Sequence, residues 1–126
     1  QYPLTVPGRV EIPEAGAAVE AIGPRSGRAI ERGGDSVAVD AAAVGASLVV
    51  RSRAAGDWMR PLGLGGRKKL QDLFVDRKVS RDDRDRTPVV TDERGRIVWV
   101  AGVALAEEFQ VTSGTNAVVV LRLRRF

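Results

Sequence analysis

The sequence contains no cysteine and no histidine among its 126 residues. Without cysteine there is neither a disulfide framework nor a thiolate zinc site. Without histidine, the commonest metal ligand and the side chain that titrates near neutral pH are missing as well. These absences argue against metal catalysis and against catalytic triads. Aromatic residues make up 5% of the chain, so few rings are present for stacking on nucleic-acid bases.

Long apolar runs are also lacking, since no segment approaches the roughly 20 residues that cross a bilayer. The chain opens with Gln1 rather than with a charged signal-peptide start. We therefore expect no membrane partner, a cytoplasmic location, and a piece cut from a longer protein. The length is that of one domain with a single core.

Basic residues are plentiful and unevenly distributed. The chain carries 20 basic and 16 acidic residues, for a net charge of +4 and a pI near 10.3, which favours a polyanionic partner. Residues 51–86 hold eleven of the basic residues and six of the acidic ones. All of the excess positive charge is thus concentrated in this one segment.

The first 50 residues alternate short β-rich runs with turns, which predicts a small antiparallel sheet with strands at 4–6, 9–12, 17–22 and 36–39. Residues 33–36 are predicted to form a turn. Asp40 is predicted to cap one helical turn that Gly45 ends. Residues 48–53 alternate as a strand, which would present Arg51 and Arg53 together on one face.

A glycine-rich loop at 60–66 precedes a predicted helix at 67–79, with Leu70, Leu73 and Phe74 on its buried face. Basic residues at 67–69 would occupy the first turn of this helix and oppose its macrodipole, a conflict that a bound anion would remove. Ser80 is predicted to cap a second short helix, with Asp83 completing an imperfect capping box before Pro88. The two helices form a hairpin.

The remaining sequence reads as β structure. Residues 88–91 and 96–100 flank a turn at 92–95, which predicts a hairpin with Trp99 in the core. A last strand at 118–124 places Val119, Leu121 and Leu123 on one face. Strands that flank a single helical segment indicate the α+β class.

The block GDWMRPLGLGGRKKLQDLF at 56–74 is the strongest local signal for function. Glycines let a backbone approach a phosphate closely, and lysine or arginine neutralises the phosphate charge. The alternative interpretation is a structural turn whose basic residues are simply solvated. A Walker A loop is ruled out, because Gly66 is followed by Arg67, Lys68 and Lys69 with no serine or threonine to hold magnesium.

This block, together with Arg51 to Arg53, Lys78-Val79, Arg84, Pro88 to Val90 and the sequence GRIVWVAG, resembles the C-terminal domain of tRNA(Ile)-lysidine synthetases. The resemblance spans 48–124 and extends loosely to Val6-Pro7-Gly8 and Val39-Asp40. The chain departs from the family pattern at Ser80, where proline is usual, and at Trp58-Met59, where Arg-Phe-like pairs are common.

The resemblance implies a fold and a parent enzyme. The fold is an α+β, β-rich three-layer domain, with β-sandwich-like sheets and a short helical hairpin, similar to a domain of the phenylalanyl-tRNA synthetase β chain. In the parent, a separate N-terminal PP-loop domain uses ATP and magnesium to attach lysine to C2 of cytidine 34 in a tRNA(Ile) with a CAU anticodon. Gly33-Gly34-Asp35-Ser36 imitates the PP-loop signature incompletely, so we expect no cofactor, metal or catalytic residue in this chain.

The resemblance also implies that this domain holds the tRNA acceptor stem and body. An A-form stem offers phosphates and 2′-hydroxyls, which suit basic side chains. Of the candidates, Arg60 beside Asp57 and Arg84 among aspartates are the most suited to internal salt bridges. The predicted tRNA contacts are Arg51, Arg53, Arg60, Arg67, Lys68, Lys69, Lys78, Arg81 and Arg84.

Two other functions are compatible with the sequence. In the first, the domain is a docking domain that braces the catalytic domain or a homodimer without contacting RNA. An independent small enzyme is the second, but its acids and lysines form no recognisable catalytic constellation.

Overall fold

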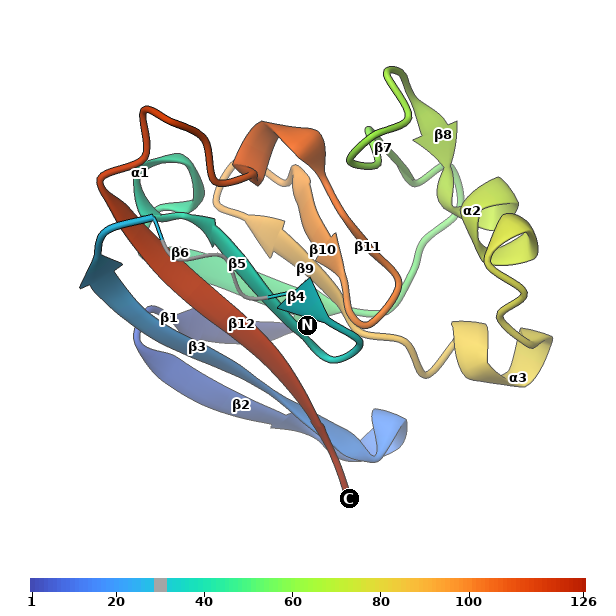
Figure 1. Ribbon diagram of the computed structural model, residues 1–126. Helices are drawn as coiled ribbons and strands as arrows, with labels where there is room; N and C mark the ends of the chain where they lie inside the picture. Colours follow the sequence, from blue (N-terminus) through green and yellow to red (C-terminus); the bar gives the residue numbers. More distant parts are fainter. Residues whose placement is uncertain (29–31) are drawn as a thin grey trace.

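Two five-stranded antiparallel sheets face each other in the computed structural model, which describes residues 1–28 and 32–126 (Figure 1). The first sheet has the order β1 (Tyr2–Thr5), β6 (Ser47–Arg51), β9 (Val89–Asp92), β10 (Ile97–Val100) and β11 (Ala104–Leu105). The second has the order β2 (Gly8–Ile12), β3 (Ala17–Ser26), β12 (Ala117–Arg125), β5 (Ser36–Asp40) and β4 (Arg32–Gly33). The predicted α+β, sandwich-like class is confirmed.

The core lies between the sheets. Strand β12 contributes alternate positions to it, whereas β9 and β10 are buried at every position. Val119, Leu121 and Leu123 of β12 are at most 4% exposed, as the alternation predicts. They belong to one apolar cluster with residues of the opposite sheet, among them Leu48 and the predicted core residue Trp99. Because β-branched and leucine side chains fill both inner faces, the sheets pack as a single unit.

The prediction of one small sheet for residues 1–50 was wrong. Strand β1 pairs with β6, whereas β2 pairs with β3, so the chain changes sheets at residues 6–7. A Cβ on Gly8 would lie 2.4 Å from the carbonyl oxygen of Thr5, which only glycine avoids at this crossing. The partner of β1 is distant in sequence, and short apolar runs carry no information about such non-local pairing.

Smaller elements follow the local sequence signals. Asp40 accepts a hydrogen bond from Ala42 N–H and caps α1 (Ala41–Val44), which ends at Gly45 as predicted. The turn predicted at 33–36 joins β4 to β5. Two 3-10 turns, η1 (Pro13–Ala15) and η2 (Glu107–Phe109), were not predicted.

A long excursion separates two neighbouring strands of the first sheet. Strands β6 and β9 are directly paired, with Arg51 opposite Val89, yet residues 52–88 lie between them and project to one side of the sandwich (Figure 1). We call these residues the basic lobe; it contains β7 (Trp58–Met59), β8 (Lys68–Lys69), α2 (Leu70–Asp76) and α3 (Arg81–Arg84). A hairpin needs only two to five residues, so the pairing of β6 with β9 does not require the lobe.

The basic lobe is firmly attached to the sandwich. Leu70, Leu73 and Phe74 of α2 are at most 2% exposed and belong to the main core cluster, as predicted. Leu62 N–H donates to the carbonyl of Leu105 at 2.9 Å, and the Arg77 guanidinium donates to the carbonyl of Val103 at 2.6 Å. The lobe therefore holds its side chains in fixed positions relative to the sheets.

Helix α2 begins at Leu70, three residues later than predicted. Lys68 and Lys69 pair with Met59 and Trp58 in the β7–β8 ribbon, and Leu70 N–H donates to the carbonyl of Asp57 at 3.0 Å. The basic residues at 67–69 consequently lie outside the first helical turn. The predicted conflict with the helix macrodipole, and the anion that would relieve it there, are both wrong.

Candidate nucleic-acid interface

Arg51 is a structural residue in this fold. Its guanidinium forms two hydrogen bonds of 2.9 Å with the carboxylate of Asp57, and both side chains are mostly buried. Asp57 also accepts from Ala54 N–H at 2.7 Å. Burial alone raises the pKa of Asp57, but the bonds from Arg51 and Ala54 outweigh it and lower the pKa below the ordinary 3.8. This pair ties the start of the basic lobe to the end of β6.

Two further predicted contacts are ion-paired within the lobe. Arg53 donates to Asp85 at 2.9 Å, and Lys68 pairs with Asp76. Strand β6 ends at Arg51, so the prediction that Arg51 and Arg53 lie together on one strand was wrong, and each has its own aspartate. Arg51 rather than Arg60 pairs with Asp57, which corrects the predicted Arg60 salt bridge.

Arg84 is held by a backbone carbonyl and not by an aspartate. Its guanidinium donates to the carbonyl of Val79 at 3.0 Å, so the predicted salt bridge of Arg84 is not formed among the described residues. Ser80 caps α3 as predicted by accepting from Asp83 N–H at 3.2 Å. The capping box is not completed, because the Asp83 carboxylate pairs with Arg86.

Four of the nine predicted contacts remain exposed and have no side-chain partner among residues 1–28 and 32–126. They differ from the paired cations in that no aspartate lies within ion-pair distance. Two exposed carboxylates in the lobe, Asp72 and Asp82, are unpaired there as well. The four free cations, which we call the open cations, are Arg60, Lys69, Lys78 and Arg81.

The ninth predicted contact, Arg67, stacks on a tryptophan. Its guanidinium carbon lies 4.1 Å from the ring centroid of Trp58, a cation–π contact. The indole is 45% exposed. The stack places a positive charge beside a large exposed aromatic surface, a combination that the sequence pattern did not reveal.

Lys78 adopts a left-handed backbone conformation, with φ of 57°. It follows the end of α2, where Val79 N–H donates to the carbonyl of Phe74 and Lys78 N–H to that of Val75. Glycine is the usual residue at this point of such a helix end, because other residues meet a steric cost there. Lysine is therefore placed at a position that favours glycine.

Replacing Lys78 by glycine is expected to raise the free energy of unfolding by about 1 kcal/mol. Lys78→Ala removes the same side chain but keeps the steric cost, and it serves as the matched control. Urea denaturation of both variants measures the difference. Equal stability of the two variants would show that the left-handed conformation carries no cost here.

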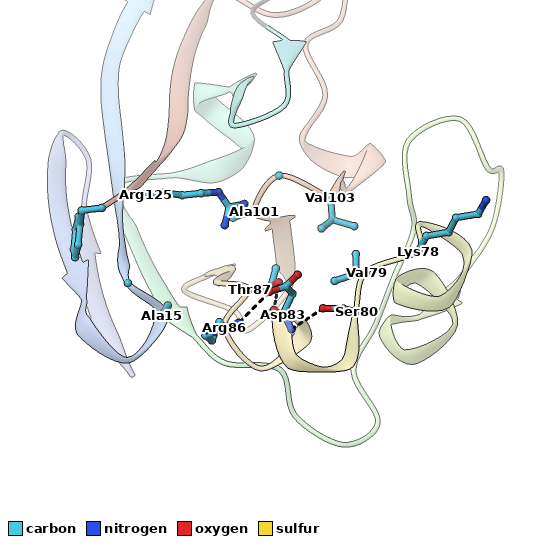
Figure 2. A pocket seen from close by; sticks show the side chains of 13 residues that line it. Ala15, Lys78, Val79, Ser80, Asp83, Arg86, Thr87, Ala101, Val103 and Arg125 are labelled. Carbon is cyan, nitrogen blue, oxygen red and sulfur yellow. Dashed lines mark hydrogen bonds and ion pairs between the residues drawn. The ribbon is translucent and has the colours of Figure 1, made fainter.

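A cavity of about 640 Å³ lies between α3, the turn after β10 and the end of β12. Figure 2 shows Arg125 reaching into this cavity, Ser80, Asp83 and Thr87 along its α3 side, and Lys78 pointing away from it. Arg125 lies 3.8 Å from Asp35, and Arg86 is paired with Asp83. Of the three cations that line the cavity, Arg86 and Arg125 are ion-paired and Lys78 is one of the open cations.

Known proteins are similar to this chain in both sequence and fold. The family model described as the TilS substrate C-terminal domain matches residues 48–123, which include the basic lobe and all nine predicted contacts. The chain belongs to this family. A crystal structure of a TILS C-terminal domain has a TM-score of 0.80 and 34% identity, and the match covers 99% of this chain and 97% of that one.

Curated relatives carry the name tRNA(Ile)-lysidine synthase. The protein from Symbiobacterium thermophilum is 38% identical over 98% of this chain, and that from Geobacillus kaustophilus is 40% identical over 81% of it. The chain spans 26% and 22% of the lengths of these two proteins. It therefore corresponds to about a quarter of each, and the resemblance read from the sequence is confirmed.

The described residues contain no group of three or more acidic, cysteine or histidine side chains arranged to hold a metal ion. No helix among them has the length and apolar character to cross a membrane. The candidate interface is characterised by the four open cations, the Trp58–Arg67 stack and the attachment of the basic lobe to the sandwich.

Proposed function

We propose that this chain is the tRNA-binding C-terminal domain of a tRNA(Ile)-lysidine synthase and that the basic lobe is the surface that meets the RNA. The observation that carries the proposal is the lobe itself: an excursion that the pairing of β6 with β9 does not need, rigidly attached, with four open cations. Connecting segments held on a rigid scaffold often carry the binding residues of a domain. The family membership and the names of the relatives support the same assignment.

The lobe binds the phosphates of the RNA. Arg60, Lys69, Lys78 and Arg81 offer guanidinium and ammonium groups that no aspartate neutralises among the described residues, so binding costs no internal ion pair. An A-form stem presents phosphates and 2′-hydroxyls across a wide, shallow groove, which such groups reach without reading base edges. Binding of this kind positions a tRNA body or acceptor stem and carries little sequence information.

The remaining predicted contacts support the surface from within. Arg51, Arg53 and Lys68 fix the lobe through their aspartates, and Arg84 holds the junction between α2 and α3. In this proposal the catalytic domain lies in the parent protein outside this chain, in the cytoplasm, and there binds ATP and magnesium. Attachment of lysine to cytidine 34 of tRNA(Ile) occurs at that domain.

Binding of the chain to a tRNA(Ile) transcript at two salt concentrations tests the proposal. Contacts with phosphates release counterions, so the affinity is expected to fall steeply and linearly on logarithmic axes as salt rises. A domain that only braces the catalytic domain or a homodimer would bind tRNA weakly at both concentrations. Gel shift or fluorescence anisotropy provides the measurement.

A further inference from the structure

Trp58, Arg67 and Lys69 share one face of the β7–β8 ribbon. Trp58 lies directly opposite Lys69 in the register, so these two side chains are on the same side. Arg67 precedes β8 and joins them by stacking on the Trp58 ring. Met59 and Lys68 occupy the other side, where Met59 is 2% exposed and Lys68 pairs with Asp76. The outer face of the ribbon thus carries an indole between two cations.

Arg67 covers part of the Trp58 indole, and the rest of the side chain is exposed. Arg67 lies over the ring at 4.1 Å, but it does not line the adjacent cavity of about 250 Å³, which Trp58 borders together with Met59 and residues of the β9–β10 turn. Arg94 of that turn is exposed at the cavity and forms no ion pair among the described residues. Trp58 therefore borders a hollow whose lining also includes the free cation Arg94 and the exposed carboxylate of Glu108.

We propose that Trp58 is a stacking site for one unpaired nucleotide of the bound RNA. An exposed indole offers an apolar surface on which any base stacks, and a nearby cation binds the attached phosphate. Lys69 and Arg94 flank the ring on two sides and supply that charge, while Arg67 holds the indole in place from its covered part. The ligand class is a single-stranded ribonucleotide, in contrast to the paired stem that the other open cations, Arg60, Lys78 and Arg81, hold.

This inference rests on the proposed function and adds a contact of a different physical kind. Phosphate contacts weaken with salt, whereas stacking on an aromatic ring depends little on it. Removing the indole should therefore lower the affinity without changing the slope of affinity against salt. Removing an open cation should lower both.

Tryptophan fluorescence can test this inference, because the two tryptophans of the chain differ in exposure. Trp58 is 45% exposed and Trp99 is 3% exposed, so a change in emission on RNA binding reports on Trp58. The probes are a hairpin RNA stem with an unpaired 3′ tail and the same stem with a blunt end. We expect the tailed RNA to quench emission strongly and the blunt RNA to quench it weakly, with no change in a Trp58→Phe variant that retains only Trp99.

Affinity measurements complete the test. Trp58→Ala is expected to weaken binding of the tailed RNA about tenfold, at an unchanged salt slope, and to leave the blunt RNA unaffected. A tRNA transcript with and without its unpaired 3′ nucleotides then shows whether the stacked base comes from that end or from a loop. Trp58→Phe keeps an aromatic ring and is expected to retain most of the affinity if Trp58→Ala disturbs folding.

Two results would overturn the inference while leaving the proposed function intact. One is unchanged Trp58 emission when the tailed RNA is bound. The other is an equal loss of affinity for tailed and blunt RNA in the Trp58→Ala variant. Failure of the unmodified chain to bind any of these RNAs at low salt would instead overturn the proposed function itself, and this inference with it.

Discussion

Replacement of all four open cations by glutamine is expected to lower the affinity for tRNA about a hundredfold to a thousandfold near 0.1 M salt. An exposed charge pair at contact distance contributes about 1 kcal/mol, so four such contacts account for this range. The slope of log affinity against log salt is expected to fall by about three to four, close to one for each lost phosphate contact. The substituted residues are Arg60, Lys69, Lys78 and Arg81.

A variant with the same change in net charge on the other sheet provides the matched control. Glutamine at four arginines of the second sheet and its edge leaves the basic lobe intact, and the affinity is expected to stay within a few-fold of the unmodified chain. Equal losses in both variants would mean that binding follows net charge alone and that the lobe has no special role. The control positions are Arg9, Arg25, Arg28 and Arg124.

The same substitutions separate RNA binding from catalysis in the parent protein. Because the proposed function places catalysis outside this chain, loss of the open cations should impair lysidine formation on tRNA and spare ATP binding. Impaired ATP binding in the lobe variant would instead favour a bracing role for this domain. Circular dichroism of the variant chain controls for folding, which should be unchanged because all four side chains are exposed.

Asp57→Ala is expected to lower the free energy of unfolding by about 2–3 kcal/mol, the largest stability effect that we predict. The substitution removes two charge-assisted hydrogen bonds with Arg51 and one with Ala54 N–H, and it leaves a mostly buried guanidinium without its counter-ion. Urea denaturation near neutral pH measures the loss. Asp85→Ala, which breaks the pair with Arg53 at a carboxylate that is 75% exposed, is the control and should cost much less.

The Asp57 contribution is also expected to depend on pH. The pKa of Asp57 is lowered in the folded chain, so its stabilisation is present above the ordinary carboxyl pKa. The stabilisation is lost as the pH falls through the lowered value. The difference in stability between the unmodified chain and Asp57→Asn should therefore narrow on acidification below about pH 4. A constant difference down to the acid limit would contradict the assigned pairing.

Local signals in the sequence predicted local structure well. The Asp40 and Ser80 caps, the turn at 33–36 and the hairpin around 92–95 all depend on residues within a few positions of one another, and the structure contains each of them. The buried face of α2 was also predictable, because leucine and phenylalanine at helical spacing indicate a packed side. The family resemblance supplied the sandwich-like architecture, which the strand patterns alone did not specify.

Non-local pairing was beyond the reach of the sequence pattern. The choice of β6 as the partner of β1 depends on residues more than 40 positions apart. The start of α2 was misplaced because the β7–β8 ribbon pulls Lys68 and Lys69 into an extended conformation. Which cations stay open was unpredictable for the same reason, since Arg53 meets Asp85 across 32 residues and Lys68 meets Asp76 only once the lobe is folded.

Some features of the candidate site carried a weak signal. The sequence around Trp58 does not indicate that its ring is exposed. Arg67, which covers part of the ring, is nine residues away in the chain. The left-handed Lys78 had a clearer clue, because it lies between the end of an apolar helical pattern and a capping serine. Helices commonly end at a residue in the left-handed conformation.

The lobe leaves and re-enters the sheet at one cross-strand pair, Arg51 opposite Val89. The two ends of the lobe are therefore adjacent in space. This geometry favours replacing the lobe by the corresponding segment of a relative. Yet Leu70, Leu73 and Phe74 belong to the main core cluster, and a graft that omitted them would leave a cavity there. Exchange of the lobe between related domains therefore requires these buried residues as well as the charged ones.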